Sequence, residues 1–443
     1  MIDIKIIRQD PQRFKQAAEH KRMSCDIDTL CSLDDRRRTL QQELDQLKHE
    51  QNETGGQIAL YRNPKSKFYQ QALDQGQTAE TLTAQSQILV DQMADLKEKA
   101  KGLEDEFREV NEQFEALLLT VAQPADPEVP LGKDDTENVE VRRVGDLPKS
   151  DFEMVDHVAL MTRLGMLDVE RGVKLAGTRN YVLRGDGVLL HQAVLRLALD
   201  LMVQRGFVPM GVPVLVRDEM MVGTGYYPGG EEQAYRCERD QMSLVGTAEV
   251  PLTAMHGEEI LSEEELPKKY VACSTCFRRE AGAAGKDTYG LYRIHLFDKV
   301  EQVIVCRNDE ELSKHHHAEI VQNAEDVLAR LELPYRVVNV CTGDLGQGQV
   351  QKFDIETWMP SRNGYGETHS ASRFYEYQAR RLKLRYRDGQ KKIRFCHTLN
   401  NTVIASPRIL IALMENHQTA DGRIRVPEAL RAYLGGREYL GGQ

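Results

Sequence analysis

The sequence has no run of about 18 consecutive apolar residues, which is the length that a membrane-spanning helix needs. Its first residues, "MIDIKIIRQDPQRF", lack the long apolar stretch and the small-residue cleavage site of a secretory signal. Cysteine is sparse: eight cysteines are scattered over 443 residues, which argues against a dense disulfide framework. With 41% hydrophobic and 29% charged residues, we expect a soluble, cytoplasmic protein with reduced thiols.

Two common nucleotide-binding motifs are also missing. No Gly-x-Gly-x-x-Gly follows a predicted strand, and no Gly-Lys-Ser/Thr of the Walker type occurs. The formal net charge of −11 argues against binding nucleic acid or an anionic membrane through overall charge. A nucleic-acid partner that is bound by a local basic patch remains open.

A heptad pattern is the most regular feature that is present. Apolar residues recur seven apart at Leu82, Leu89, Leu96, Leu103, Val110 and Leu117, with Met93, Ala100, Phe107 and Phe114 between them. Alternating steps of three and four residues are typical of a coiled-coil seam. A shorter series at Leu33, Leu40, Leu44 and Leu47 predicts a partner helix. We expect a long antiparallel two-helix coiled coil over about residues 33–120.

The segment between these two helices breaks at Asn63-Pro64 and carries basic residues at Arg62, Lys65 and Lys67. Two interpretations of the hairpin stay open at this point. It is either a dimerisation coiled coil or an arm that reaches for a long polyanion, because the spacing accounts for stability in both cases.

After residue 122 the composition changes. Three prolines and many acidic residues predict a linker over residues 123–150, between a helical arm (1–122) and a second domain (151–443). Segments such as "YVACSTCFRRE" and "PYRVVNV" read as strands, but regular crossover helices do not separate them. This order favours an α+β fold with an antiparallel sheet flanked by helices.

One stretch, "CFRREAGAAGKDTYGLYRIHLFDKVE", concentrates charge around a Gly/Ala-rich centre. If residues 270–280 and 291–301 are strands, alternation places Arg293, His295, Phe297, Lys299 and Glu301 on one face, and Ile294, Leu296 and Val300 on the other. Arg278 and Glu280 likewise point one way. The simplest alternative is a solvated sheet face.

This stretch closely resembles motif 2 of class II aminoacyl-tRNA synthetases, and of seryl-tRNA synthetases of the bacterial type in particular. Other segments follow in the family's order. "GFVPMGVPVLV" resembles motif 1, with Pro213 at its characteristic proline in the dimer motif, and "GTAEVPLT" resembles the serine-binding loop. "YGETHSASRFYEYQARR" and "HTLNNTVIASPRILIALMENHQ" are similar to the ATP–metal segment and to motif 3. The N-terminal hairpin matches the family's tRNA-binding arm, so the resemblance covers essentially the whole chain.

The resemblance implies an ATP site and a Mg²⁺ site. Arg278 would hold the α-phosphate and the substrate carboxylate, Phe297 would stack on adenine, and Arg408 would meet the γ-phosphate; Arg278 and Arg408 are the implied catalytic residues. The implied ATP-binding set is Arg278, Arg279, Glu280, Phe297, Glu367, Thr368, His369, Ser370 and Arg408. Glu367 and Ser370 would be the Mg²⁺ ligands, and hard oxygen donors suit that ion.

The implied serine-binding residues are Thr247, Ala248, Glu249, Arg278, Glu301 and Thr402. Thr247 and Glu249 would face the substrate if "TAE" is extended. A pocket that hydrogen-bonds a hydroxyl rejects alanine, because its polar groups would otherwise be left unpaired. Threonine would have to be excluded by lack of room for its methyl group.

The implied activity is that of a homodimeric seryl-tRNA synthetase. Serine and ATP would give seryl-adenylate and pyrophosphate, and the seryl group would then pass to the 3′ end of tRNA(Ser), with tRNA(Sec) left open as a second acceptor. Two alternatives are a serine-activating paralogue with a non-tRNA acceptor and a degenerate, non-catalytic binding protein. The presence of Arg278, Glu301 and Arg408 disfavours the second, and the long heptad arm disfavours the first.

Some positions depart from the family pattern. His369 stands beside the implied metal ligands, where the family usually has serine, and Leu296 replaces a glutamine. We expect Leu296 to pack behind the sheet, away from the substrates.

Two further groups suggest metal binding. In Cys273-x-x-Cys276, strand alternation places the sulfurs on opposite faces and argues against zinc. His315, His316 and His317 begin a predicted helix and are expected to be a solvated first turn.

Overall fold

The computed structural model describes residues 1–282 and 289–441. The chain divides into two compact units. One comprises Asp3–Lys15 and Cys25–Val121, and the other comprises Met1–Ile2, Gln16–Ser24 and Ala122–Gln443. In the part of the chain that the structure describes, no helix is long and apolar enough to cross a membrane.

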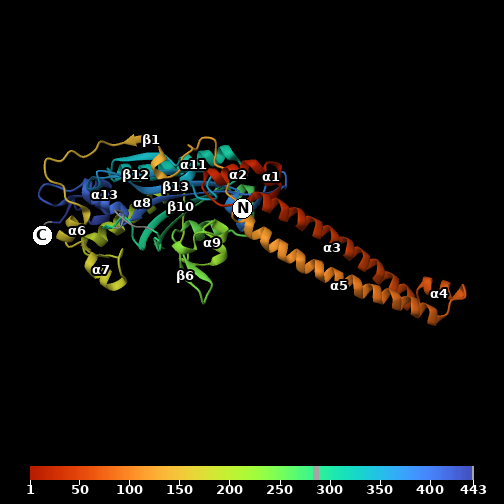
Figure 1. The fold of residues 1–443 in the computed structure, drawn as a ribbon. Helices are drawn as coiled ribbons and strands as arrows, with labels where there is room; N and C mark the ends of the chain where they lie inside the picture. The colour runs from red at the N-terminus through yellow and green to blue at the C-terminus, as the bar shows by residue number, and fades with distance from the viewer. Residues whose placement is uncertain (283–288, 442–443) are drawn as a thin grey trace. The chain divides into compact units, whose positions relative to one another are not determined.

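The first unit is a helical hairpin. Its two long helices, α3 (Ile27–Arg62) and α5 (Ala79–Leu118), run side by side, and α4 (Lys67–Asp74) lies at the end where the chain turns (Figure 1). Asp26 and Thr78 cap the N-termini of the long helices, each accepting a hydrogen bond from a main-chain amide of the first turn. Asn63-Pro64 follows the last residue of α3, as a helix-breaking pair predicts. The short helices at the start of the chain are α1 (Ile4–Gln9) and α2 (Pro11–His20).

The predicted coiled-coil seam is confirmed. The seam positions of α5 are buried or half-buried along the helix, with Leu82, Ala100 and Phe114 the buried ones, while most residues between them are exposed. Leu40 and Leu44 of α3 are buried as well. Arg37 covers this seam, since its guanidinium lies 4.4 Å from the centre of the Phe114 ring.

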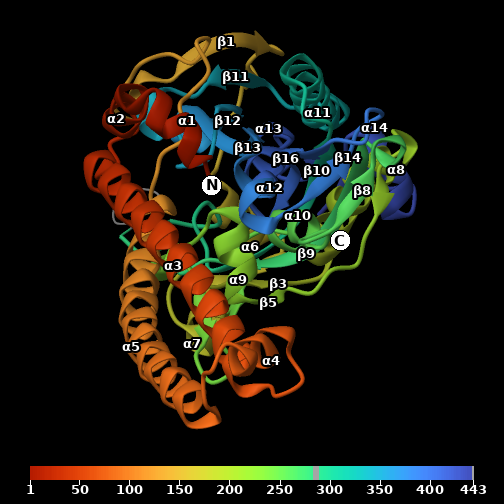
Figure 2. The same ribbon diagram turned by 90° about the vertical axis from the view of Figure 1, so that its right-hand side faces the viewer.

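The second unit is built on an eight-stranded sheet with the order β1-β11-β12-β13-β16-β10-β9-β4. Figure 2 shows most of these strands in succession. Neighbouring strands are antiparallel, except that β4 and β9 are parallel. The strands are β1 (Val139–Val144), β4 (Val208–Pro209), β9 (Lys268–Phe277), β10 (Leu296–Cys306), β11 (Tyr335–Asn339), β12 (Gln351–Met359), β13 (Gly364–Tyr375) and β16 (His397–Ser406). The edge strand β1 lies in the segment 123–150 that was expected to be a linker.

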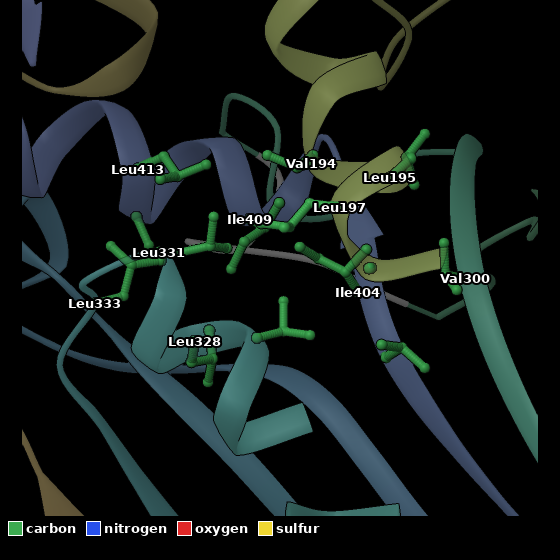
Figure 3. Close-up of a cluster of buried hydrophobic side chains, with 14 of the residues drawn as sticks. Val194, Leu195, Leu197, Val300, Leu328, Leu331, Leu333, Ile404, Ile409 and Leu413 are labelled. Atoms are coloured by element: carbon green, nitrogen blue, oxygen red, sulfur yellow. The ribbon is translucent and has the colours of Figure 1, made fainter. Parts of the chain in front are cut away.

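Helices cover one face of this sheet and form the main core with it. Figure 3 shows side chains of α8 (Asp186–Gln204), such as Val194 and Leu197, meeting Ile404 of β16 and Ile409 of α13 (Arg408–Asn416). The end of α11 (Glu310–Arg330) adds Leu328 to the same cluster. Burying a side chain of this size stabilises the fold by about 2 kcal/mol, so this layer holds the sheet rigidly behind the opposite face.

Smaller elements surround these layers. The remaining helices are α6 (His157–Arg163), α7 (Val169–Ala176), α9 (Asp218–Thr224), α10 (Glu249–Ala254), α12 (Tyr377–Leu382) and α14 (Glu428–Arg431). The remaining strands are β2 (Leu167–Asp168), β3 (Val182–Leu183), β5 (Leu215–Arg217), β6 (Tyr235–Cys237), β7 (Met242–Leu244), β8 (Ile260–Ser262), β14 (Arg385–Arg387), β15 (Ile393–Phe395), β17 (Ile424–Arg425) and β18 (Tyr439–Leu440).

Three details differ from the sequence-based expectations. The second strand of the charge-rich stretch begins at Leu296, so alternation does not extend to residues 291–295. Leu296 itself is 42% exposed and does not pack into the core, because it stands at the strand's open end. His316 and His317 are buried rather than solvated, since α11 turns that side toward the sheet; His317 Nε2 lies 3.0 Å from the Ala371 carbonyl oxygen.

Candidate active site

A polar pocket of about 150 Å³ opens on the face of the sheet opposite the helical layer. Its wall is formed by strands β10, β13 and β16 and by the segments around them. It is lined by Tyr226, Glu249, Arg278, Glu280, Tyr292, Ile294, Phe297, Lys299, Glu301, Gln349, Glu367, Thr368, Ser370, Ser372, Asn400, Thr402, Ala405 and Arg408. Most of these side chains can donate or accept hydrogen bonds, so the pocket suits a small, highly charged ligand.

A β-bulge in β13 decides which of its residues face the pocket. Glu367 pairs with Glu356 and His369 pairs with Ile355, so β13 has one residue more than β12 at this point. The extra residue reverses the alternation. Glu367 and Ser370 therefore face the pocket although they are three residues apart, while His369 turns into the interior.

A second bulge does the same in β16. Glu301 pairs with Thr402, whereas Val300 pairs with Ile404, which leaves Val403 as the extra residue of β16. Thr402 and Ala405 consequently line the pocket together, and Ile404 points into the core behind the sheet.

Two buried carboxylates lie at one end of the pocket. Glu249 accepts hydrogen bonds from Tyr226 Oη at 2.7 Å and from Gln378 Nε2 at 2.8 Å. Glu301 is fully buried, and its Oε2 lies 2.6 Å from Lys299 Nζ. Burial, helped by the nearby charge of Glu301, raises the pKa of Glu249 to about 7. This end of the pocket can therefore accept a cationic group such as an ammonium.

Arginines lie at the other end. Arg278 follows β9, and its guanidinium stands 5.3 Å from the centre of the Phe297 ring while donating to the Gly246 carbonyl oxygen. Arg408 begins α13 and donates to the carbonyl oxygens of Tyr292 and Glu367 at 2.9 and 3.0 Å. Both guanidiniums are held through main-chain carbonyls, which leaves their positive charge uncompensated by those partners and available to a bound anion.

Glu367 is the acidic group within this cationic part of the pocket. Its removal from bulk solvent acts to raise its pKa, but Arg408, Lys352 and other cations outweigh that effect and hold the pKa below its ordinary value. Asp354 is different: burial raises its pKa to about 7 despite the ammonium of Lys352 nearby. Glu367 is therefore the carboxylate that stays ionised.

The structure brings most of the sequence-predicted site residues together. Arg278, Glu280, Phe297, Glu301, Glu367, Thr368, Ser370, Thr402, Arg408 and Glu249 all line the pocket. Glu280 is fixed by an ion pair with Arg293, whose Nη1 lies 3.0 Å from Glu280 Oε2.

Four predicted site residues do not line the pocket. Arg279 is exposed beside it, and His369 is buried on the other side of β13. Ala248 is packed in a hydrophobic cluster, and Thr247 accepts a hydrogen bond from Glu249 N, because Glu249 begins helix α10 and its N-cap, Ala248, has a helical and not an extended backbone.

Ile294 was expected on the back of the sheet but lines the pocket, since it precedes β10. Pro213 lies exposed between β4 and β5. The centre of the predicted motif 2 loop, residues 283–288, is outside the described residues.

Several lining residues were missed by sequence reasoning. Tyr226 and Gln349 come from loops with no strand or helix period, and no residue pattern distinguishes Asn400 from the polar residues Asn401 and Thr402 that follow it. Among residues 1–282 and 289–441, no cluster of three or more His, Cys, Asp or Glu side chains forms a metal site. Cys273 is exposed and Cys276 buried, as the predicted opposite faces require.

Family comparisons cover both units of the chain. The family described as "Seryl-tRNA synthetase N-terminal domain" matches residues 1–123. The family described as "tRNA synthetase class II core domain (G, H, P, S and T)" matches residues 235–417. The second match contains every strand and helix that supplies the pocket from β9 to Arg408.

Individual relatives match over the full length. A serine–tRNA ligase of Deinococcus radiodurans is 45% identical, with 100% of this chain and 99% of the relative covered. One of Rubrobacter xylanophilus is 41% identical with the same coverage of 100% and 99%. These matches do not favour a paralogue with another acceptor or a non-catalytic binding protein.

Solved structures agree. The crystal structure of seryl-tRNA synthetase from Pyrococcus horikoshii complexed with ATP has a TM-score of 0.86, 35% identity and coverage of 100% of both chains. That of cytoplasmic serine–tRNA ligase from Naegleria fowleri in complex with AMP has a TM-score of 0.83 and 30% identity, covering 100% of this chain and 99% of that one. With its pocket, its two family matches and its full-length relatives, the chain belongs to the seryl-tRNA synthetases, class II aminoacyl-tRNA synthetases that act as serine–tRNA ligases.

Proposed function

We propose that the pocket binds L-serine and ATP side by side and joins them to seryl-adenylate, with release of pyrophosphate. The observation that carries this assignment is the separation of charge within one pocket, with buried carboxylates at one end and arginines at the other. An amino acid presents an ammonium and a carboxylate, and ATP presents a triphosphate. The pocket is complementary to that pair of ligands.

The acidic end would hold serine. Glu249 and Glu301 are the partners for its ammonium, and Thr402, whose Oγ1 lies 3.4 Å from Glu301 Oε2, is a polar partner for its hydroxyl. Such groups are buried and lose a hydrogen-bond partner when alanine binds, which would disfavour alanine by about 1–3 kcal/mol for each unpaired group.

The cationic end would hold ATP. Arg278 stands between the two ends and would bind the α-phosphate and the serine carboxylate, which are the two anions that must meet. Phe297 would stack on adenine, Glu280 would face the adenine end, and Arg408 would bind the γ-phosphate. Activation needs no general base, because the attacking serine carboxylate is already ionised; the rate would come from positioning and from fixed positive charge.

Glu367 and Ser370 fit a Mg²⁺ ion. The bulge in β13 turns both oxygen donors to the same side, and the lowered pKa of Glu367 keeps it ionised. Mg²⁺ in nucleotide sites is commonly held by one or two protein oxygens together with substrate phosphates. When bound, the ion would neutralise charge on those phosphates.

The second step would pass the seryl group to the 3′ end of tRNA(Ser). The exposed basic residues Arg62, Lys65 and Lys67 at the tip of the hairpin support a role in binding the tRNA backbone. We include tRNA(Sec) as a second candidate acceptor for this step.

We also propose that the chain forms a homodimer through the motif 1 region around Pro213. We further propose a division into a helical arm (1–122), a linker and entry segment (123–150) and a catalytic domain (151–443).

A cytoplasmic location is supported by the cysteines. All eight lie in the described part of the chain and are free thiols.

The test is serine-dependent exchange of radiolabelled pyrophosphate into ATP, followed by charging of purified tRNA(Ser) with labelled serine. Exchange and charging would support the proposal. If serine stimulated no exchange at any Mg²⁺ concentration, the assignment of the pocket would be wrong.

A further inference from the structure

A buried lysine holds one wall of the pocket from outside. Lys21 is 3% exposed and lies in the same compact unit as the sheet. Its ammonium donates to three main-chain carbonyl oxygens, those of Gly346 at 3.0 Å, Gln347 at 3.1 Å and Gln349 at 2.6 Å. An ammonium has three N–H donors, so each has one oxygen of this turn as its partner.

The turn of residues 346–349 leads directly to the pocket. The Gln349 side chain closes the turn by accepting from Gly346 N at 2.6 Å, and it donates to Ser372 Oγ at 2.7 Å. Both Gln349 and Ser372 line the pocket. Lys21 therefore positions the pocket wall through a single residue, Gln349.

A second cavity, also about 150 Å³, lies on the other side of this wall. It is lined by the turn 346–349 and by Phe374 and Tyr377, and it shares Tyr226, Glu249 and Gln349 with the first pocket. Position 348 has no room for a side chain on this wall, because a Cβ added to Gly348 would stand 2.3 Å from the Tyr377 ring. The turn thus separates the acidic end of the pocket from space large enough for additional side-chain atoms.

We propose that Lys21 is a positioning residue that fixes the turn 346–349 as the wall of the serine site and thereby limits the size of the amino acid that is accepted. This inference rests on the proposed binding of serine between Glu249 and Glu301. If the ammonium is removed, all three carbonyls lose this donor, although the Gln347 carbonyl keeps its hydrogen bond from Gln123 N at 2.9 Å, and the turn relaxes toward the second cavity. The acidic end then holds serine less firmly and gains room for the methyl group of threonine.

The position of Lys21 at the end of helix α2 fixes the direction of its side chain. It follows the last residue of α2, and Arg22, with a φ of 56°, adopts the left-handed conformation that ends the helix. Burial also lowers the pKa of Lys21 to about 7, as expected for an ammonium surrounded by carbonyls rather than carboxylates.

The test compares the full-length wild type with Lys21→Met, Lys21→Arg and Arg22→Met in serine- and threonine-dependent pyrophosphate exchange. Lys21→Met keeps the apolar stem and removes the charge. We expect its KM for serine to rise about tenfold with KM for ATP and kcat little changed, and its preference for serine over threonine to fall roughly tenfold. Lys21→Arg restores part of both properties.

Arg22→Met is the matched control, since Arg22 is the adjacent cation and donates to the Lys133 carbonyl oxygen, away from the pocket. It is expected to behave as the wild type. An unchanged serine KM and threonine discrimination in Lys21→Met would overturn the inference, and so would equal increases of the serine and ATP KM values together with a lowered Tm. The absence of serine-dependent exchange in the wild type would instead contradict the proposed function.

Discussion

Glu249 and Glu301 are joined by a single amide: Asn400 Nδ2 donates to Glu249 Oε2 at 2.8 Å and to Glu301 Oε1 at 3.1 Å. Two buried carboxylates repel each other unless cations or donors lie near both. Lys299 balances the charge of Glu301, while the side chains that donate to Glu249 within residues 1–282 and 289–441, those of Tyr226, Gln378 and Asn400, are neutral. An ammonium bound between the carboxylates would supply the missing charge.

Glu249 consequently makes serine binding pH-dependent. With its pKa raised to about 7, it takes up a proton as the pH falls below 7, and the attraction for the serine ammonium is lost. We expect KM for serine to rise by up to about tenfold per pH unit below pH 7. In Glu249→Gln the KM is high throughout and nearly independent of pH; a wild-type KM that stays flat from pH 8 to 6 would contradict this assignment.

The raised pKa of Glu249 also lowers the free energy of unfolding as the pH rises from 4.5 to 7. The folded carboxyl holds its proton more tightly than the unfolded one, whose pKa is near 4.5, so Glu249 destabilises the ligand-free fold as the pH rises from 4.5 to 7. Glu249→Gln removes this contribution, and thermal melts at both pH values measure it.

Arg278 and Arg279 form a matched pair for the phosphate assignment. Arg278 lines the pocket and Arg279 is exposed beside it. We expect Arg278→Ala to lower pyrophosphate exchange by at least about 10²-fold, as the loss of one fixed transition-state donor does. Arg279→Ala is expected to leave exchange nearly unchanged. A folded Arg278→Ala variant with normal exchange would refute the role of Arg278.

Variants at Glu367 and His369 distinguish a role in metal binding from a role in packing. Glu367→Gln removes the ionised donor, and we expect the Mg²⁺ concentration for half-maximal exchange to rise several-fold. His369→Ser leaves a gap in the interior and is expected to lower the free energy of unfolding by about 1–3 kcal/mol without changing the Mg²⁺ requirement. Magnesium titrations and thermal melts of both variants distinguish these outcomes.

Leu296 and Val300 lie on the same face of β10 and test how burial changes from its open end to its middle. Leu296 is 42% exposed, so Leu296→Gln is expected to change the free energy of unfolding by less than about 0.5 kcal/mol and to leave exchange intact. Val300 is fully buried against the helical layer, and Val300→Gln is expected to destabilise the fold by several kcal/mol. Denaturant unfolding of both variants is the measurement; equal effects would mean that the start of β10 is as buried as its middle.

Substitutions at the hairpin tip are expected to affect the transfer of serine to tRNA and not the activation of serine. Replacing Arg62, Lys65 and Lys67 together by alanine is expected to raise KM for tRNA(Ser) about tenfold and to weaken its salt dependence. Pyrophosphate exchange, which needs no tRNA, serves as the internal control and stays at the wild-type rate. Unchanged charging would show that the tip does not contact the tRNA.

Local sequence pattern was sufficient for the hairpin, because the heptad at Leu82–Leu117 needs only one partner helix. Family resemblance located Arg278, Glu301 and Arg408 in one pocket. Neither approach could place His369 or Ile294, because strand alternation fails where β13 bulges and where β10 has not yet begun. Tyr226 and Gln349 come from loops. Their positions are set by long-range packing, which the two-residue period of a strand and the 3.6-residue period of a helix do not predict.

The bulge in β13 has a consequence for how this segment tolerates insertions and deletions. Deleting Thr368 would restore simple alternation with Glu367 and Ser370 two residues apart, so both oxygen donors would still lie on the pocket side of β13. A conservative exchange at Thr368 keeps the residue count and leaves both oxygen donors in the pocket. The shared orientation of Glu367 and Ser370 is therefore compatible with a bulged spacing of three residues or a regular spacing of two, and the identity of these two oxygen donors is more tightly constrained than the number of residues between them.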